Sequence, residues 1–103
     1  MKQNIPTPNR QQVLIDLYVQ YLLGTLTQGE LLSYLRKIVL KLSQEKYATL
    51  VGVSRRTITD IEQNKGSQTT QILDKVFKPL GLKTGLVPTH THIAKKILQQ
   101  TED

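Results

Sequence analysis

Two adjacent arginines, Arg55 and Arg56, are the residues of this sequence that most clearly suggest a chemical role. They follow Ser54, whose hydroxyl can accept hydrogen bonds from the free amides at a helix start. In that helix Ile58 and Ile61 face inward, and the two arginines lie on the polar side. Positive charge at a helix start opposes the helix dipole and destabilises the helix by a few tenths of a kcal/mol. This unfavourable placement indicates that the guanidinium groups serve a purpose outside the helix.

The other polar residues give little indication of a catalytic, metal or cofactor site. The chain has no cysteine, which excludes thiolate metal sites and cysteine nucleophiles. His90 and His92 would share a face only in a strand, and no further histidine could complete a metal site. No serine stands in a recognisable arrangement with a histidine and an acid, and no glycine-rich phosphate loop is present. We therefore predict no enzyme activity, no metal and no cofactor.

Length and charge limit the remaining classes of protein. A chain of 103 residues fits one domain and leaves little room for a large active-site cleft. Its 14 Lys and Arg against 8 Asp and Glu give a formal charge of +6, which favours a polyanionic partner such as nucleic acid. No apolar run reaches the length of a membrane span, and no signal-peptide region follows Met1. We expect a cytoplasmic protein without membrane contact.

Helical spacing of apolar residues predicts the elements that position the arginines. Residues 1–9 hold two prolines and predict a flexible arm. Thr27 and Glu30 match a capping box, which starts a helix whose solvated face is expected to carry Arg36, Lys37 and Lys41. Helices are predicted over 10–23, 27–42, 44–51, 55–63, 70–78 and 91–100, with a short strand over 82–87. The predicted parts of the chain are the arm, an additional N-terminal helix (10–26), a central domain (27–88) and a C-terminal tail (89–103).

The stretch 42–65, LSQEKYATLVGVSRRTITDIEQNK, is the most informative part of the chain. It predicts a short helix, a tight turn and a second short helix. Tyr47 and Ala48 face inward, and the small Ala48 lets the two helices approach closely. Gly52 can take a left-handed conformation where the first helix ends, and Val53 covers the small core between the helices.

This stretch resembles the helix-turn-helix of the phage Cro and lambda-repressor type, the XRE family. The resemblance covers roughly residues 30–88, with the motif itself at 43–63. It implies an all-α fold, a lambda-repressor-like five-helix DNA-binding domain that acts as a homodimer. The matching residues are Leu42, Ser43, Gln44, Glu45, Ala48, Gly52, Val53, Ser54, Thr57, Ile58, Ile61, Glu62, Asn64, Lys65 and Gly66.

The family also implies roles for individual residues, because its second motif helix lies in the major groove. Glu62 matches a position that pairs with basic groups and is structural. The positions that read bases in the family are Ser54, Arg55, Arg56, Asp60 and, more weakly, Thr59. The positions that contact phosphates are Gln44, Thr57 and Lys65.

The chemistry of these side chains fits base recognition. Arginine can bind guanine O6 and N7 with two parallel hydrogen bonds. Asp60 suits a cytosine amino group, or orients Arg56 four residues before it. Many family members carry glutamines where Arg55 and Arg56 stand, so their base preference does not transfer. We expect at least one guanine in each half-site.

Two segments outside the motif call for a partner surface. The helix over 10–23 has an apolar stripe that must pack on its own domain or on a second subunit. The segment 82–87 has no strand to pair with in a helical chain. Pairing with the same segment of a second subunit would supply the missing strand. It would also place two recognition helices about 34 Å apart on one DNA face.

The sequence LGLKTGLVP, at 80–88, resembles HipB-like antitoxins, the DNA-binding partners of HipA-type kinase toxins. That resemblance implies an autorepressor that binds its own promoter. It also implies a kinase-like toxin as a partner, contacted by the N-terminal helix and the C-terminal tail.

Together these features predict a sequence-specific DNA-binding transcriptional regulator, a homodimeric repressor of a palindromic operator in double-stranded DNA. The antitoxin role is a refinement of that prediction. Two alternatives remain open: a stand-alone phage-type repressor without a toxin, and a protein-interaction adaptor that has lost DNA binding. The paired arginines and the basic charge argue against the adaptor.

Overall fold

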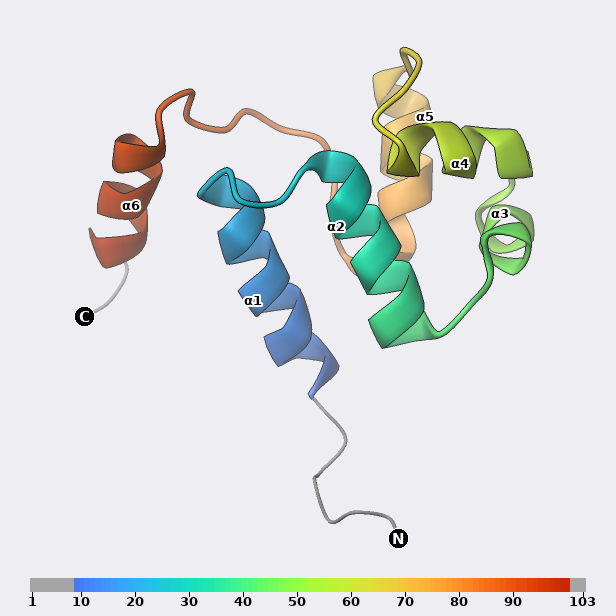
Figure 1. The fold of residues 1–103 in the computed structure, drawn as a ribbon, viewed down its shortest axis with the longest axis horizontal. Helices are drawn as coiled ribbons and strands as arrows, with labels where there is room; N and C mark the ends of the chain where they lie inside the picture. The colour runs from blue at the N-terminus through green and yellow to red at the C-terminus, as the bar shows by residue number, and fades with distance from the viewer. Residues whose placement is uncertain (1–8, 101–103) are drawn as a thin grey trace, which may run out of the picture.

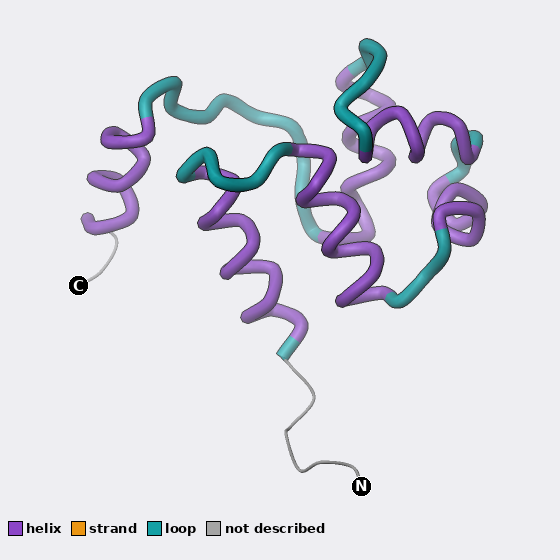
Figure 2. The backbone as a smooth tube through the Cα atoms, in the orientation of Figure 1, coloured by secondary structure: helices purple, strands orange, loops and turns teal. Residues whose placement is uncertain are grey.

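The computed structural model describes residues 9–100, and the arm predicted for the first residues lies outside this part except for Asn9. The described chain is all-α, as predicted, and contains no strand (Figure 1, Figure 2). Its elements are α1 (Arg10–Leu22), α2 (Gln28–Tyr34), the π-helical segment η1 (Leu35–Leu40), α3 (Gln44–Val51), α4 (Arg55–Glu62), α5 (Thr70–Phe77), the 3-10 turn η2 (Lys78–Leu80) and α6 (Thr91–Gln100).

Short polar side chains start the helices where the sequence predicts. Thr27 accepts a hydrogen bond from the Glu30 amide at 3.1 Å, and Glu30 accepts one from the Thr27 amide at 2.9 Å. Ser43 and Ser54 cap α3 and α4 in the same way, each accepting a bond from the amide three residues on. These bonds satisfy amides that have no partner inside the helix. The starts of α2, α3 and α4 are therefore set locally.

The helix predicted over 27–42 differs from the prediction in its second half. It continues beyond α2 as η1, whose wider turns end at Lys41 with a left-handed φ of 55°. A π-helical turn shifts side chains relative to the regular 3.6-residue spacing. Ile38 is 44% exposed, whereas Arg36, expected on the solvated face, is only 5% exposed. Lys37 and Lys41 are exposed, as predicted.

A single core lies where α4 packs against both α2 and α3. α1 adds Leu14, Leu17, Tyr18 and Tyr21, which are partly buried against this core. The apolar stripe of the N-terminal helix therefore packs on its own domain. The most deeply buried side chains are Leu32, Leu35, Tyr47, Ile58, Ile61 and Val76.

The C-terminal part of the chain leaves the core in an extended segment. Residues 82–87, predicted as a strand, form none in the single chain, and pairing across a dimer stays a prediction. α6 has the predicted bounds and lies beside the end of α1, away from α3 and α4 (Figure 1). It buries Ala94, and its Thr91 hydroxyl donates to the Leu23 carbonyl at 3.5 Å.

Tyr47 joins α3 to α5, because its hydroxyl donates to the carbonyl oxygen of Val76 within the core. Burial, together with the nearby negative charge of Glu62, raises the pKa of Tyr47 to about 12. A tyrosine in the unfolded chain has a pKa of about 10, so the folded chain holds this proton more tightly. The stabilisation is complete below pH 10 and is lost as the pH rises to about 12.

We expect the free energy of unfolding to fall by about 2 kcal/mol between pH 10 and 12 through Tyr47. Urea unfolding at pH 9, 11 and 12 measures this loss. The Tyr47→Phe variant is the control, since lysine deprotonation affects both proteins alike. It should be about 1 kcal/mol less stable at pH 9 and should lose less stability above pH 10. Equal losses in both proteins would show that Tyr47 is not the group responsible.

Candidate nucleic-acid interface

The turn between α3 and α4 fixes the angle of the two helices. Gly52 takes a left-handed φ of 81°, and its amide donates to the Ala48 carbonyl at 2.9 Å. The Val53 amide shares that carbonyl at 3.1 Å. Lys75 of α5 donates to the Gly52 carbonyl at 3.4 Å, which places a positive charge at the C-terminal end of α3. The turn is therefore held by backbone bonds and by a side chain from a third helix.

Ser54 and Thr57 hold the first turn of α4. The Ser54 hydroxyl accepts a bond from the Thr57 amide at 3.1 Å and lies 2.9 Å from the Thr57 hydroxyl. Ser54 is exposed, and Thr57 is half-buried. Both hydroxyls already have a structural partner, so any bond to DNA would be made in addition to this pair.

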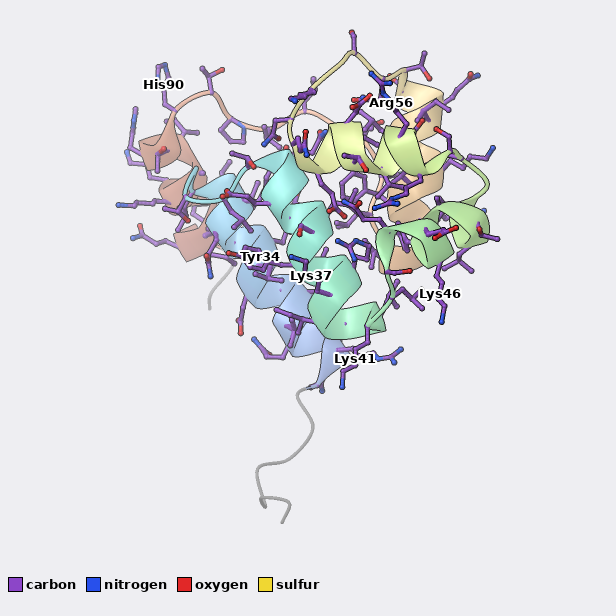
Figure 3. The ribbon with its side chains drawn as sticks, turned by 45° about the vertical axis from the view of Figure 1, so that its right-hand side comes forward. Tyr34, Lys37, Lys41, Lys46, Arg56 and His90 are labelled. Atoms are coloured by element: carbon purple, nitrogen blue, oxygen red, sulfur yellow. The ribbon has the colours of Figure 1, made fainter. Side chains whose placement is uncertain are left out.

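Arg55 and Arg56 extend from the start of α4 into solvent. The Arg56 side chain, labelled in Figure 3, is 86% exposed, and its Nε lies 3.7 Å from Asp60 Oδ2. The orienting pair considered for these two residues is thus present. Within residues 9–100, the Arg55 side chain makes no hydrogen bond or ion pair. Two guanidinium groups are therefore available to a ligand that approaches this end of α4.

A buried polar network fixes the other end of α4. The Arg36 guanidinium donates to both Glu62 carboxylate oxygens, from Nε at 2.6 Å and from Nη2 at 3.0 Å. Both side chains are less than a tenth exposed. Gln44 at the start of α3 donates to Glu62 Oε1 at 2.9 Å and accepts a bond from the Thr59 hydroxyl at 3.1 Å. Because Glu62 belongs to the ion pair, the pair also helps to fix the orientation of the Gln44 side-chain amide.

The loop after α4 is tied to the start of α2. Asn64, with a φ of 58°, accepts a bond from the Gly29 amide at 2.9 Å and donates to the Thr27 hydroxyl at 3.1 Å. Lys65 follows with an exposed side chain, and its amide donates to the Asp60 carbonyl at 2.7 Å. The backbone at Lys65 is thus held while its ammonium group remains in solvent.

A family model described as Helix-turn-helix matches residues 32–87, which is more than half of the chain. The chain belongs to the helix-turn-helix family. No curated protein and no solved structure matches it.

The family identifies this helix-turn-helix protein as an XRE-type, DNA-binding transcriptional regulator, and its matched domain as regulatory rather than catalytic. None of the helices in the described residues has the length and apolar character to cross a bilayer. Across residues 9–100, no three His, Cys, Asp or Glu side chains group together as a metal site. The rings of His90 and His92 stack on each other, with centroids 5.6 Å apart.

The structure brings most of the predicted site residues of this helix-turn-helix protein to one region. Arg55, Arg56 and Asp60 lie along the exposed side of α4. Thr59 is bonded to Gln44 rather than directed freely to solvent, which favours a positioning role over base reading. Their contacts with DNA remain predictions.

Arg36 is the residue of the helix-turn-helix domain whose environment the sequence prediction misplaced. Its guanidinium also donates from Nη1 to the Leu42 carbonyl at 2.7 Å, so it joins the segment before α3 to α4. The position of Leu32 four residues earlier, on the apolar stripe, was the available signal for burial. The predicted pairing of Glu62 with a nearby basic group is confirmed.

Proposed function

We propose that the protein is a homodimeric transcriptional repressor that binds a palindromic operator and blocks access of RNA polymerase. Phosphate contacts would fix the register on DNA, and base contacts would select the operator. Each copy would read one half-site, so that two copies related by a two-fold axis read the whole. We place this activity in the cytoplasm.

The observation that carries the proposal is the pair of exposed guanidinium groups at the start of α4. Arg55 has no partner within the described residues, and Arg56 is 86% exposed beside Asp60. An exposed helix start fits the major groove, where arginine can bind guanine with two bonds. We propose Arg55, Arg56 and Asp60 as the base-reading residues, with Ser54 at the edge and Thr59 acting through Gln44.

Gln44, Thr57 and Lys65 are the proposed phosphate contacts. Gln44 lies in the first turn of α3, where unpaired backbone amides and the helix dipole favour an anion. Its amide is held by Glu62 and by Thr59, so its position is defined before DNA arrives. Lys65 is exposed in the loop that follows α4. Along the chain, Gln44 precedes the proposed base readers, Thr57 lies among them and Lys65 follows them.

A titration of palindromic DNA against random DNA at several salt concentrations tests the proposal. A regulator should bind more weakly as salt rises, because phosphate contacts release counterions. It should also prefer its operator over random DNA by about 1,000-fold or more. A protein-interaction adaptor would show no binding even at low salt. That result would exclude the proposed function.

Single substitutions distinguish base readers from phosphate contacts. We expect Arg55→Ala and Arg56→Ala each to relax specificity at one base pair, with about 1–3 kcal/mol of discrimination lost there. Lys65→Ala should instead weaken binding to all sequences alike. Lys95→Ala, on α6, is the neutral control. Binding to a library of operator variants provides the measurement, and uniform loss on Arg55→Ala would make that arginine a phosphate contact.

The antitoxin role is the finer part of the proposal. It rests on the resemblance of residues 80–88 to HipB-like antitoxins, and it gives α1 and α6 as toxin contacts. A kinase-like reading frame directly beside the gene, whose product co-purifies with this protein, would support it. Without such a neighbour, the stand-alone repressor is favoured.

A further inference from the structure

A groove of about 340 Å³ with both apolar and polar lining residues lies on the side of the core formed by α1, α2, α5 and the segment after η2. Its walls include Tyr18, Leu31, Leu73, Phe77 and Leu82. Lys83 is the one charged residue among those that line it. The apolar side chains among these walls can therefore receive an apolar group.

Leu86 stands at the edge of this groove without entering it. It lines the groove, yet the residue is fully exposed, at 103% of its reference area. Val87, the next residue, is 46% exposed. A large apolar side chain that stays wholly in water contributes no free energy of burial to the fold. The chain thus presents an apolar projection beside a groove that has apolar side chains in its walls.

The backbone around Leu86 is also without partners. The Thr84 amide donates to Asp74 Oδ1 at 2.8 Å, which anchors the beginning of the segment on α5. Within residues 9–100, the amides of Gly85, Leu86 and Val87 donate to no acceptor. An extended segment with free amides can pair with another extended segment. The segment is therefore anchored at one end and open along the rest.

We propose that a second copy of the chain occupies the groove, with Leu86 of each copy seated in the groove of the other. A two-fold interface uses the same patch on both subunits, and a patch with both a projection and a hollow is self-complementary. The nearly uncharged lining permits this in a chain of net charge +6. The inference rests on the proposed dimeric function and names the surface that forms the dimer.

The area that a stable dimer requires is larger than the extended segment alone supplies. Such an interface buries about 800 Å² on each copy. Residues 82–87 would extend only about 20 Å, at roughly 3.3 Å per residue, and cannot supply that area by strand pairing alone. Insertion of Leu86 brings the walls of the groove into the interface. The two copies are then joined by side-chain packing and not only by backbone bonds.

The first test compares Leu86→Glu with Leu50→Glu by sedimentation over a range of concentrations. Leu50, on α3, is 58% exposed and does not line the groove. We expect wild type and Leu50→Glu to be dimers and Leu86→Glu to be a monomer with an unchanged melting profile of the helices. Loss of the second subunit should reduce affinity for the palindrome by roughly 100-fold or more. Binding to an isolated half-site should remain unchanged.

The second test uses the absence of cysteine from the chain. A tagged Leu86→Cys protein is mixed with an untagged Thr70→Cys protein, since Thr70 also lines the groove. Mild oxidation should give a covalent heterodimer, and Leu50→Cys in place of Thr70→Cys should not. A dimer that survives Leu86→Glu and forms no such bridge would overturn the inference and leave the dimeric repressor intact. A wild-type protein that is monomeric even on palindromic DNA would overturn both.

Discussion

Replacing Gly29 with alanine is expected to destabilise the fold by about 3 kcal/mol. Gly29 is buried in the first turn of α2, where α2 meets the end of α4. A Cβ there would lie 2.5 Å from the carbonyl oxygens of both Ile61 and Glu62, and 2.8 Å from Asn64 Oδ1. Two of these neighbours are backbone atoms, so the end of α4 must move. Thermal and urea unfolding measure the effect.

Gly85→Ala is the matched control for Gly29→Ala. A Cβ at Gly85 meets no atom within 4 Å, so the fold should tolerate it with little change in stability. Both variants should be compared at a protein concentration where they have the same oligomeric state. If the Gly29→Ala variant had the same melting temperature as the Gly85→Ala variant, the close approach of α2 to α4 would not be a constraint on the fold.

Removal of Arg36 is expected to have a comparable or larger effect. The Arg36→Ala variant leaves the Glu62 carboxylate buried and without its ion pair, for an expected loss of about 3–5 kcal/mol. The double variant Arg36→Met with Glu62→Leu removes both charges and should recover most of that stability. Urea unfolding of the three proteins gives the comparison. Equal instability of the single and double variants would show that the charge left unpaired is not the cause.

The same double variant separates stability from DNA binding. Gln44 would lose the acceptor that holds its side-chain amide, because that acceptor is Glu62 Oε1. We therefore expect a folded protein whose affinity for DNA falls for all sequences alike, as for loss of a phosphate contact. Unchanged affinity would show that Gln44 needs no such support.

Features set by nearby residues were predictable from the sequence. The caps at Thr27, Ser43 and Ser54 depend on residues within one helical turn, and α3 and α6 have their predicted bounds. The pair of Arg56 with Asp60, one turn apart, was recognisable for the same reason.

Features that depend on distant residues were not predictable. The partner of Arg36, Glu62, is 26 residues away in the sequence. The environment of Gln44 likewise depends on α4. The segment 82–87 is the opposite case, because its local pattern predicted a strand but no neighbouring strand exists in the described chain to pair with it.

The two arginines of α4 take no part in the core or in the network around Glu62, and this gives the protein freedom to change its operator. The core, the caps and the network around Glu62 would remain if Arg55 and Arg56 were exchanged for other residues. Uncharged residues there would even relieve the unfavourable charge at the helix start. Mutation can therefore explore new target sequences at these positions without first threatening the fold. A lineage of such regulators can diverge in what it controls while its architecture stays constant.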